Sequence, residues 1–285
     1  MTTLVRKPAD FRQACDDARA ASRRVGLVPT MGALHDGHFS LIDEAKKRAD
    51  FVAVTIFVNP LQFAPGEDLD RYPRTLEDDL AGCRERGVDL VFAPEPGSMY
   101  PAQFQTRVSV GAITKPLEGG FRPTHFDGVT TVVTKLFNLA GPCAAMFGRK
   151  DYQQWRILSR MAEDLDMPIE VVGCAIVREP DGLALSSRNR YLSASERKRA
   201  LGLVSGLRRA CDAWLAGERN PDALRSLVAE RVQSSFDRVD YVAAVDPETL
   251  VASEGTPTRL LIAVAAHMAT TRLIDNVVLG EDPRP

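Results

Sequence analysis

Short apolar runs alternate with stretches of helical periodicity as far as about residue 177. The run 51–58 is apolar throughout, and a strand that is apolar on both faces belongs inside a parallel sheet covered by helices. Between the runs, Phe39, Ile42 and Ala45 recur at the spacing of an amphipathic helix. The pattern therefore predicts an α/β domain. Its predicted strands are 25–28, 51–58, 88–94, 143–147 and 169–177, with a short edge strand at 107–110, and its predicted helices are 8–21, 37–49, 75–87, 129–139 and one that ends at 165.

The pattern changes character in the last third of the sequence. Amphipathic helices are predicted at 195–216, with Trp214 in the core, and at 221–236. Alternating or buried strands are predicted at 239–245, 260–265 and 273–278. We therefore expect two domains, a large one at residues 1–177 and a small α+β one at residues 178–285.

Composition narrows the classes of protein and partner. The chain has 285 residues, of which 45% are hydrophobic, and a net charge of −2, so charge gives no reason to expect nucleic acid or an anionic membrane as a partner. The five cysteines are odd in number and lack CxxC spacing, which favours buried thiols in a reducing compartment. No apolar stretch resembles a signal peptide or is long enough to cross a bilayer, and we expect a cytoplasmic protein.

The stretch 29–38, PTMGALHDGH, lies between the first predicted long strand and its helix. The carboxyl ends of parallel strands are where open α/β sheets bind ligands. Gly32 and Gly37 would let the backbone approach a ligand, and free N–H groups at the helix N-terminus would suit phosphate. His35 and His38 are three residues apart, so both imidazoles are expected on one side of the first turn. This stretch predicts nucleotide chemistry.

Other interpretations of the same stretch stay open. A zinc site needs three or four ligands, and only His125 and His267 remain as further histidines, which disfavours a metal. The histidines and glycines are also compatible with an ordinary turn.

Further candidates follow other strands. Asn59 and Gln62 have side-chain amides that would bind a carboxylate or hydroxyl of a substrate. Alternatively, these amides only stabilise the turn in which they lie. Asp78 and Asp79 hold Mg²⁺-bound water, or stabilise a helix that opens with a capping box of Thr75 and Asp78.

Basic side chains lie in three of the remaining segments. The predicted loop 117–129 carries Arg122 and His125, which either close over an anionic substrate or are incidental. Lys150 follows a strand and a glycine, and is either a phosphate ligand or a solvated lysine. The run 186–188 offers two hydroxyls and an arginine to a triphosphate, or forms a helix cap with a surface arginine.

Six sequence motifs, taken in their order along the chain, match the pattern of a known family. They are PTMGALHDGH, FVNPLQF, YPRT, EGGFRPTHFDGV, FGRKDYQQ and DGLALSSRNRYL. Together they resemble the pantothenate synthetase (pantoate–β-alanine ligase) family over nearly the whole chain. The segment 35–38 is similar to the HxGH signature of the nucleotidyltransferase-like superfamily, and 186–188 to its second phosphate-binding signature. The resemblance implies a Rossmann-like, doubly wound parallel sheet.

The resemblance also implies a two-step reaction with two small substrates. Pantoate would attack the α-phosphorus of ATP, with Mg²⁺ bound mainly through the ATP phosphates, to give pantoyl-adenylate and pyrophosphate. The amine of β-alanine would then displace AMP and form pantothenate. The family implies a homodimer, and the smaller domain would close over ATP as a lid.

The residue roles implied by the family are carried over by position. His38 takes the position of the catalytic proton donor, although from their chemistry we interpret His35 and His38 chiefly as electrostatic donors. Gln62 and Gln154 would bind pantoate, and Gln62 also β-alanine. Asn59 is a further substrate-binding candidate, from its amide and its place after a strand and not from the family. Other groups assigned to catalysis are Lys150, Ser186, Ser187 and Arg188. The implied ATP contacts are Met31, Gly32, Ala33, Leu34, His35, Asp36, Gly37, His38, Gly148, Arg149, Lys150, Asp151, Val177, Leu185, Ser186, Ser187 and Arg188.

Two positions depart from the family pattern. Leu185 stands where the family usually has Met, a swap that an apolar contact tolerates. Arg149 stands where the family usually has Glu. Because the charge is reversed, the ATP contact that the family implies at this position does not carry over directly.

Two other functions are compatible with the HxGH turn. One is a nucleotidyltransferase that moves AMP or CMP onto a phosphate ester, and the other is a non-catalytic nucleotide-binding module. A phosphate-ester acceptor calls for more basic residues than the two glutamines supply, which favours the ligase.

Overall fold

The computed structural model describes residues 2–64 and 66–285. Contacts between Cα atoms divide the chain into two units. The N-terminal unit contains the residues up to Lys115, then Arg122–Arg149 and Gln154–Ala175, and the C-terminal unit contains Pro116–Phe121, Lys150–Gln153 and Ile176–Pro285. Two short segments thus group with the C-terminal unit although they precede it in the sequence. The predicted boundary between residues 177 and 178 stays a prediction.

The N-terminal unit is built on a six-stranded sheet in which every adjacent pair is parallel. The order is β1-β4-β3-β2-β5-β6, which confirms the predicted Rossmann-like parallel sheet. The sequence pattern did not reveal β1, because this strand is only three residues long and largely exposed. The strands are β1 Thr3–Val5, β2 Val25–Thr30, β3 Phe51–Ile56, β4 Leu90–Phe92, β5 Cys143–Gly148 and β6 Ile169–Cys174.

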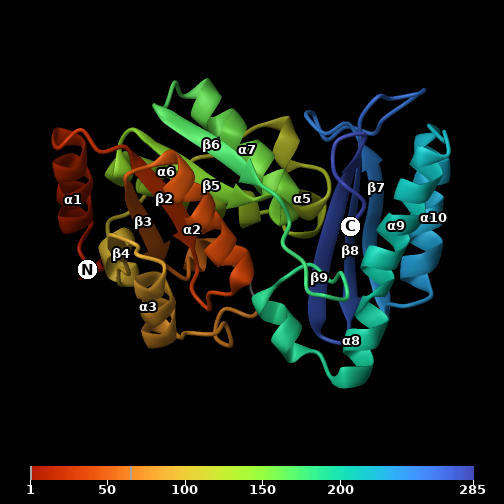
Figure 1. Cartoon of the computed structure of the whole chain (residues 1–285), viewed down its shortest axis with the longest axis horizontal. Helices are drawn as coiled ribbons and strands as arrows, with labels where there is room; N and C mark the ends of the chain where they lie inside the picture. The colour runs from red at the N-terminus through yellow and green to blue at the C-terminus, as the bar shows by residue number, and fades with distance from the viewer. Residues whose placement is uncertain (1, 65) are drawn as a thin grey trace. The chain divides into compact units, whose positions relative to one another are not determined.

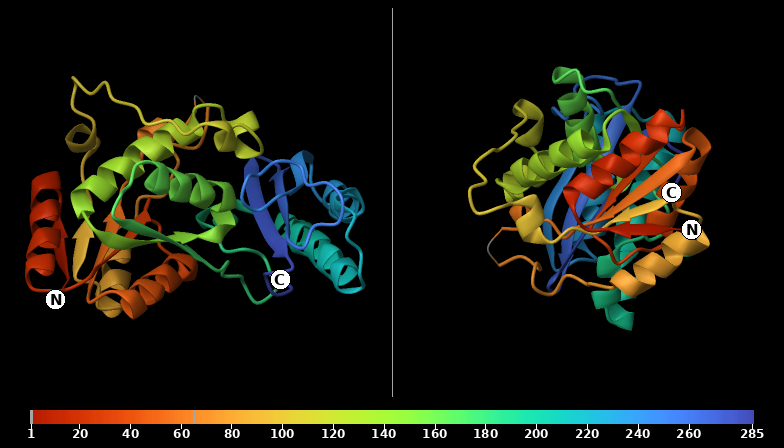
Figure 2. Two further views of the ribbon diagram at one scale, coloured as in Figure 1. Left: turned by 90° about the horizontal axis from the view of Figure 1, so that it is seen from above. Right: turned by 90° about the vertical axis from the view of Figure 1, so that its left-hand side faces the viewer.

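Helices cover both faces of this sheet (Figures 1 and 2). One face packs against α1 (Pro8–Ala20), α6 (His125–Ala140) and α7 (Tyr152–Asp164). The other packs against α2 (Asp36–Arg48) and α3 (Leu76–Glu85). Because both faces are covered, β3 is buried over five of its six residues, as the apolar run predicts.

The connections reverse direction between β2 and β5. From β2 the chain adds β3 and then β4 on one side, and β5 pairs with the other side of β2. Ligands bind at such a switch point, beyond the carboxyl ends of the strands. The turn that follows β2 and the segment that follows β5 both begin there.

The C-terminal unit has a three-stranded antiparallel sheet, β7-β8-β9. Helices α9 and α10 lie on one of its faces (Figure 1), and Trp214 is buried between them and the sheet core, as predicted. The elements are α8 Ala194–Ala200, α9 Gly202–Leu215, α10 Pro221–Gln233, β7 Arg238–Val245, β8 Leu260–Met268 and β9 Thr271–Leu279.

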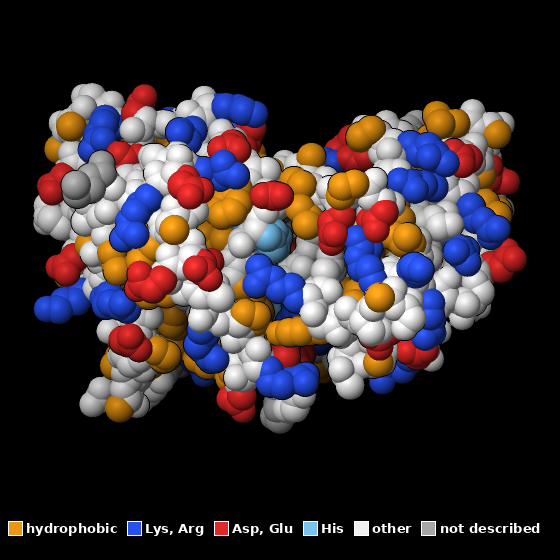
Figure 3. Space-filling view, turned by 60° about the horizontal axis from the view of Figure 1, so that its bottom comes forward, with side chains coloured by type: hydrophobic (Ala, Val, Ile, Leu, Met, Phe, Trp, Pro, Cys, Tyr) orange, Lys and Arg blue, Asp and Glu red, His pale blue; other side chains and the backbone are white. Residues whose placement is uncertain are grey.

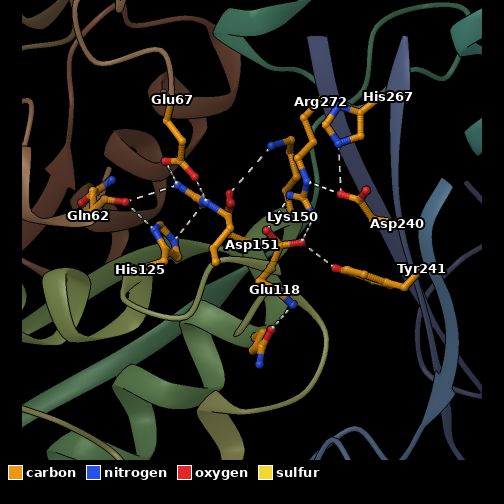
Figure 4. Close-up of polar contacts among 12 residues, drawn as sticks. Gln62, Glu67, Glu118, His125, Lys150, Asp151, Asp240, Tyr241, His267 and Arg272 are labelled. Atoms are coloured by element: carbon orange, nitrogen blue, oxygen red, sulfur yellow. Dashed lines mark hydrogen bonds and ion pairs between the residues drawn. The ribbon is translucent and has the colours of Figure 1, made fainter. Parts of the chain in front are cut away.

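An ionic network on the other face of this sheet holds the segment Pro116–Phe121. Glu118 accepts two hydrogen bonds from Arg272, of 2.6 and 2.9 Å, and one of 2.7 Å from the Tyr241 hydroxyl (Figure 4). Arg272 also donates to Asp240 at 2.8 Å. Burial raises the pKa of Asp240, but the bonds from Arg272 and His267 outweigh it and hold that pKa below its ordinary value. These contacts explain why Pro116–Phe121 groups with the C-terminal unit.

Two predicted elements are wrong because side chains make other hydrogen bonds there. Residues 107–110 form no strand, since the Val108 N–H donates to Thr131 Oγ1 and its carbonyl accepts from Thr130. The capping box of Thr75 and Asp78 is also not formed, because the Thr75 hydroxyl donates to Asp79 instead.

Two predicted helix boundaries are wrong as well. The helix expected at 195–216 is two helices, α8 and α9, separated at Leu201. The loop expected at 117–129 contains the short helix α5 (Glu118–Phe121), and α6 already begins at His125. The other short elements are α4 Pro96–Met99 and the 3₁₀ turns η1 Pro60–Gln62, η2 Ala112–Thr114, η3 Arg149–Asp151 and η4 Ser187–Tyr191.

A close backbone contact between α6 and η1 gives a test of this packing. A Cβ atom added to Gly128 would lie 2.2 Å from the Leu61 carbonyl oxygen. We expect Gly128→Ala to lower the free energy of unfolding by about 1–3 kcal/mol, the cost of overpacking. Urea unfolding measures this change. Gly97→Ala is the control, because a Cβ there meets no atom within 4 Å, and an unchanged Gly128→Ala variant would show that η1 is free to move away.

Candidate active site

The turn between β2 and α2 has an unusual backbone. Gly32 and Ala33 have φ values of 83° and 51°, so two successive residues are in the left-handed region. A side chain at Gly32 would be strained and would also meet Asp79 Oδ2 at 3.0 Å. The Gly32 N–H donates to Thr30 Oγ1, whose own hydroxyl donates to the Thr55 carbonyl on β3. The turn is therefore fixed to the sheet on the side of β3.

The two histidines of the turn lie together, as the spacing predicts. Their ring centroids are 4.2 Å apart. His35 is the N-cap of α2, and its Nδ1 accepts a hydrogen bond of 3.1 Å from the Gly37 N–H. A nitrogen that accepts cannot carry the proton of a neutral imidazole, so Nε2 of His35 is the donor atom. His35 therefore combines a structural bond at Nδ1 with a donor at Nε2.

Four backbone N–H groups of this stretch already have acceptors, and one of them, that of Gly37, lies at the helix N-terminus, where the prediction of free donors is therefore wrong. The Gly32 N–H is taken by Thr30 and the Gly37 N–H by His35. The N–H groups of Ala33 and Leu34 both donate to the carboxylate of Asp79, at 3.0 and 2.7 Å. Phosphate at this turn would therefore depend on side-chain donors more than the sequence suggested.

Asp79 is itself 2% exposed, and it also accepts a 3.3 Å hydrogen bond from the Thr75 hydroxyl. Burial raises the pKa of Asp79, and the bonds from Leu34, Ala33 and Thr75 only partly offset that effect. Asp79 lies in the first turn of α3, as the interpretation as a helix-stabilising acid predicts, but neither interpretation predicted that its oxygens bind the turn. Nothing in the local sequence pairs Asp79 with a turn some 45 residues earlier.

The loop after β3 brings Gln62 close to Met31, in the turn between β2 and α2 that carries the two histidines. The Gln62 amide donates to Met31 Sδ at 2.9 Å. Asn59 donates to Gln62 Oε1 and to the Gly128 carbonyl, both at 3.1 Å, and its own oxygen accepts from Leu61 N–H and the Tyr100 hydroxyl. Asn59 is 2% exposed, so its amide holds the loop, and its contact with substrate stays a prediction.

A second group of contacts holds the backbone at Gln62 (Figure 4). Arg122 donates twice to Glu67, both at 2.7 Å, and once to the Gln62 carbonyl at 3.3 Å. His125 Nδ1 donates to the same carbonyl at 2.9 Å, so its Nε2 is the acceptor of the 3.2 Å contact from Arg122. Burial raises the pKa of Glu67, but the bonds from Arg122 outweigh it and lower that pKa. Arg122 is thus neutralised by Glu67, an ion pair that the sequence did not predict.

The segment that follows β5 begins with Gly148 and Arg149 in the N-terminal unit. The Arg149 guanidinium lies 6.0 Å from the centroid of the Trp155 ring, a cation–π distance. This contact accommodates the positive charge that departs from the family pattern. Gln154, one of the predicted pantoate ligands, lies near the start of α7 in the same unit.

The remaining predicted ATP contacts belong to the C-terminal unit. The Lys150 carbonyl accepts a 2.9 Å hydrogen bond from Asn276, and its ammonium is 3.8 Å from Asp151. Ser186 is the N-cap of η4 and accepts from the Arg188 N–H at 3.3 Å, which is the predicted cap. Ser187 is buried. How these groups face the histidine turn stays a prediction.

A hairpin anchored by a buried ion pair precedes Ser186. The Leu185 N–H donates to the Val177 carbonyl at 3.0 Å, so these two predicted ATP contacts are paired with each other. Arg178 makes two hydrogen bonds to Asp275 on β9, at 2.7 and 2.9 Å, and donates to the Gly182 carbonyl inside the hairpin. The Asp275 side chain is fully buried. This pair fixes the hairpin to the sheet, and no sequence motif indicated it.

Three further findings concern the surface charge, membrane-spanning helices and metal ligands. Lys and Arg side chains are interspersed with Asp and Glu on the face shown in Figure 3. Among the described residues, no helix is long and apolar enough to cross a membrane, and no group of three or more His, Cys, Asp and Glu side chains is placed to hold a metal.

A parallel sheet with a pair of histidines at its switch point defines a nucleotide-handling α/β enzyme. A profile of the pantoate-beta-alanine ligase family matches residues 3–278, and the chain belongs to this family. It is 49% identical to pantothenate synthetase 1 of Bradyrhizobium diazoefficiens over 282 residues, which cover 98% of this chain and 99% of that protein. It is 50% identical to pantothenate synthetase of a Thermoanaerobacter species, over 97% of this chain and 98% of that one.

Solved structures agree with this assignment. The pantothenate synthetase of Thermus thermophilus superposes with a TM-score of 0.92 at 46% identity, over 97% of this chain and 99% of that one. A pantoate-beta-alanine ligase of Francisella tularensis, complexed with beta-gamma ATP and beta-alanine, gives a TM-score of 0.79 at 30% identity over the full length of both chains.

The ion pair beside Gln62 predicts a pH dependence of stability. A lowered pKa at Glu67 means that the carboxylate stabilises the folded state above its ordinary pKa of 4.5, and that this contribution is lost as the pH falls through the lowered value. We expect Glu67→Gln to reduce the free energy of unfolding by about 1–3 kcal/mol at pH 7. The difference from the parent should shrink in acid.

Urea unfolding at neutral and acidic pH measures both effects. Glu85→Gln, an exposed position with the same change of charge, is the control. A difference for Glu67→Gln that is constant with pH would contradict the prediction.

Proposed function

We propose that this chain condenses (R)-pantoate with β-alanine to give pantothenate, at the expense of ATP and through a pantoyl-adenylate. The observation that supports this most directly is membership of the pantoate-beta-alanine ligase family over residues 3–278. The Francisella tularensis relative, described as complexed with beta-gamma ATP and beta-alanine, supports the use of ATP and β-alanine as substrates.

In the first step, a carboxylate oxygen of pantoate forms a bond to the α-phosphorus of ATP, and pyrophosphate leaves. In the second step, the amine of β-alanine attacks the activated carbonyl carbon, and AMP leaves with the electron pair of the broken bond. Neither step needs a covalent bond to the enzyme. The enzyme lowers the barrier by orienting the reactants and by stabilising the charge that develops on phosphate oxygens.

His35 and His38 are proposed to donate to those phosphate oxygens from the N-terminal unit. The geometry supports this for His35, because its Nδ1 is occupied by Gly37 and its Nε2 is the donor. Lys150, Ser186, Ser187 and Arg188 are proposed as the donors of the C-terminal unit. Mg²⁺ would be held mainly by the ATP phosphates, since Asp79 is already bound to the turn.

Gln62 and Gln154 are proposed to bind pantoate, and Gln62 also β-alanine. The neutralisation of Arg122 by Glu67 favours this over a phosphate-ester acceptor, because the surroundings of Gln62 then carry little net positive charge. The homodimer, the cytoplasmic location and the closure of residues 178–285 as a lid are part of the same proposal. The homodimer rests on the resemblance to the family, the location on the cysteine content and the lack of a signal-peptide-like stretch, and the closure on the predicted domain boundary.

Release of AMP with each substrate omitted in turn tests the proposed function. A pantoate–β-alanine ligase forms AMP only when ATP, pantoate and β-alanine are all present. Transfer of a nucleotide to a phosphate ester in the absence of β-alanine would favour the nucleotidyltransferase. ATP binding without release of pyrophosphate when pantoate is added would indicate a binding module.

The role of His38 predicts the effect of its removal. His38→Ala should keep the fold and lower turnover by roughly 10²–10³-fold, the cost of losing one preorganised donor to a developing charge. The AMP assay and thermal unfolding measure the two quantities. Turnover close to that of the parent would remove His38 from the mechanism.

The two half-reactions separate the role of Lys150 from that of His38. If Lys150 binds phosphates that leave as pyrophosphate, Lys150→Ala should slow formation of the adenylate about tenfold or more, the loss expected for a charged hydrogen bond. The second step, started from preformed pantoyl-adenylate, should change much less. Equal losses in both half-reactions would contradict this assignment.

A further inference from the structure

The backbone of the turn between β2 and α2 is held in a conformation that it would not adopt alone. Ala33 has a φ of 51° although it has a side chain, and a non-glycine residue in the left-handed region is strained. Such a conformation persists only where the surrounding structure determines it. The turn includes Leu34, which directly precedes the first of the two histidines.

The carboxylate of Asp79 is the group that determines this conformation. Its two oxygens accept from the consecutive N–H groups of Ala33 and Leu34, at 3.0 and 2.7 Å. A carboxylate that accepts two backbone N–H bonds fixes two successive peptide planes, and hydrogen bonds to a charged group are stronger than neutral ones. The side chain of Asp79 is almost completely buried, so water does not compete for these bonds.

The position of the carboxylate is itself fixed. Asp79 lies in the first turns of α3, where Leu80 and Cys83 pack into the core, and Thr75 donates a third hydrogen bond to it. The carboxylate therefore transmits the position of α3 to the turn that carries His35.

We propose that Asp79 is a positioning residue for the reaction described above: it aims His35 and His38 by clamping the two peptide groups that precede them. The same bonds occupy donors that a phosphate would otherwise bind, so they leave the nucleotide to the imidazoles. This role rests on the proposed function in so far as the histidines act on the nucleotide. The clamp itself is independent of that function.

Asp79→Asn tests the clamp with almost no change of shape. The amide oxygen can accept only on one side, and the amide NH₂ would face a backbone N–H on the other, so one of the two bonds is lost. We expect kcat to fall by about 10–100-fold, the range for a small displacement of catalytic groups. Glu77→Gln, in the same helical turn, exposed and with the same change of charge, should stay within about twofold of the parent.

A double variant distinguishes positioning from general loss of structure. If Asp79 acts through His38, then Asp79→Asn combined with His38→Ala should be little worse than His38→Ala alone. Losses that multiply both with His38→Ala and with His35→Ala would show that Asp79 acts through neither histidine and would overturn the proposal.

The imidazole NMR signals give a readout that does not depend on activity. The chain has four histidines, and Asp79→Asn should shift the signals of His35 and His38 while leaving those of His125 and His267 in place. If the signals move but the parent chain forms no AMP, the clamp stands and the proposed function fails. Unchanged signals together with unchanged kcat would overturn the clamp.

Thr75→Val is the second variant, in case Asp79→Asn does not fold. It removes only the third bond to the carboxylate and nearly preserves volume. We expect the same direction of change with a smaller size, a loss of about two- to fivefold in kcat for one hydrogen bond at 3.3 Å. If kcat and the histidine signals both stay as in the parent, that result would argue against the clamp.

Discussion

The pairing of β2 with β5 is the constraint on which the site depends. Gly26 and Leu27 lie opposite Ala144 and Ala145, and every other strand of the sheet extends outward from this pair. Since both strands are parallel, they end at the same edge of the sheet, and the histidine turn and the Gly148 segment begin side by side. The chemistry proposed for this chain follows from this one register, because it brings together two motifs more than 100 residues apart in the sequence.

A second theme is that acids hold backbone in both units; two of them, Asp79 and Asp275, are buried and the third, Glu67, is partly buried. Asp79 binds the turn, Glu67 holds Arg122 against the carbonyl of Gln62, and Asp275 fixes the hairpin through Arg178. Each of these carboxylates is on an element distant in sequence from the group it holds. In a site that has to bind a triphosphate, acids with filled hydrogen-bonding capacity can give rigidity without leaving unpaired negative charge facing the nucleotide.

The sequence predicted what depends on local pattern. Apolar runs such as 51–58 predicted the parallel sheet, and the three-residue spacing of His35 and His38 predicted their adjacency, because both are properties of periodicity. The strand β1 was not predicted, because three largely exposed residues show no hydrophobic periodicity. The contacts of Asp79 and of Arg178 were not predicted, because they join residues many positions apart. The pattern of a single sequence does not show which distant residues pair. The prediction of a free N–H group at Gly37 is wrong for a local reason, because the side chain of the N-cap residue His35 accepts a hydrogen bond from it.

The filled donors of the turn also bear on the design of inhibitors. A compound that places an anionic group, such as a sulfonate or a carboxylate, against the backbone of Ala33 and Leu34 would have to displace a buried carboxylate to gain any hydrogen bond. A neutral linker at that point, with acceptors directed at the imidazoles of His35 and His38, does not have to displace that carboxylate. Selective chemistry against this protein should therefore be built on the two rings and not on the backbone of Ala33 and Leu34.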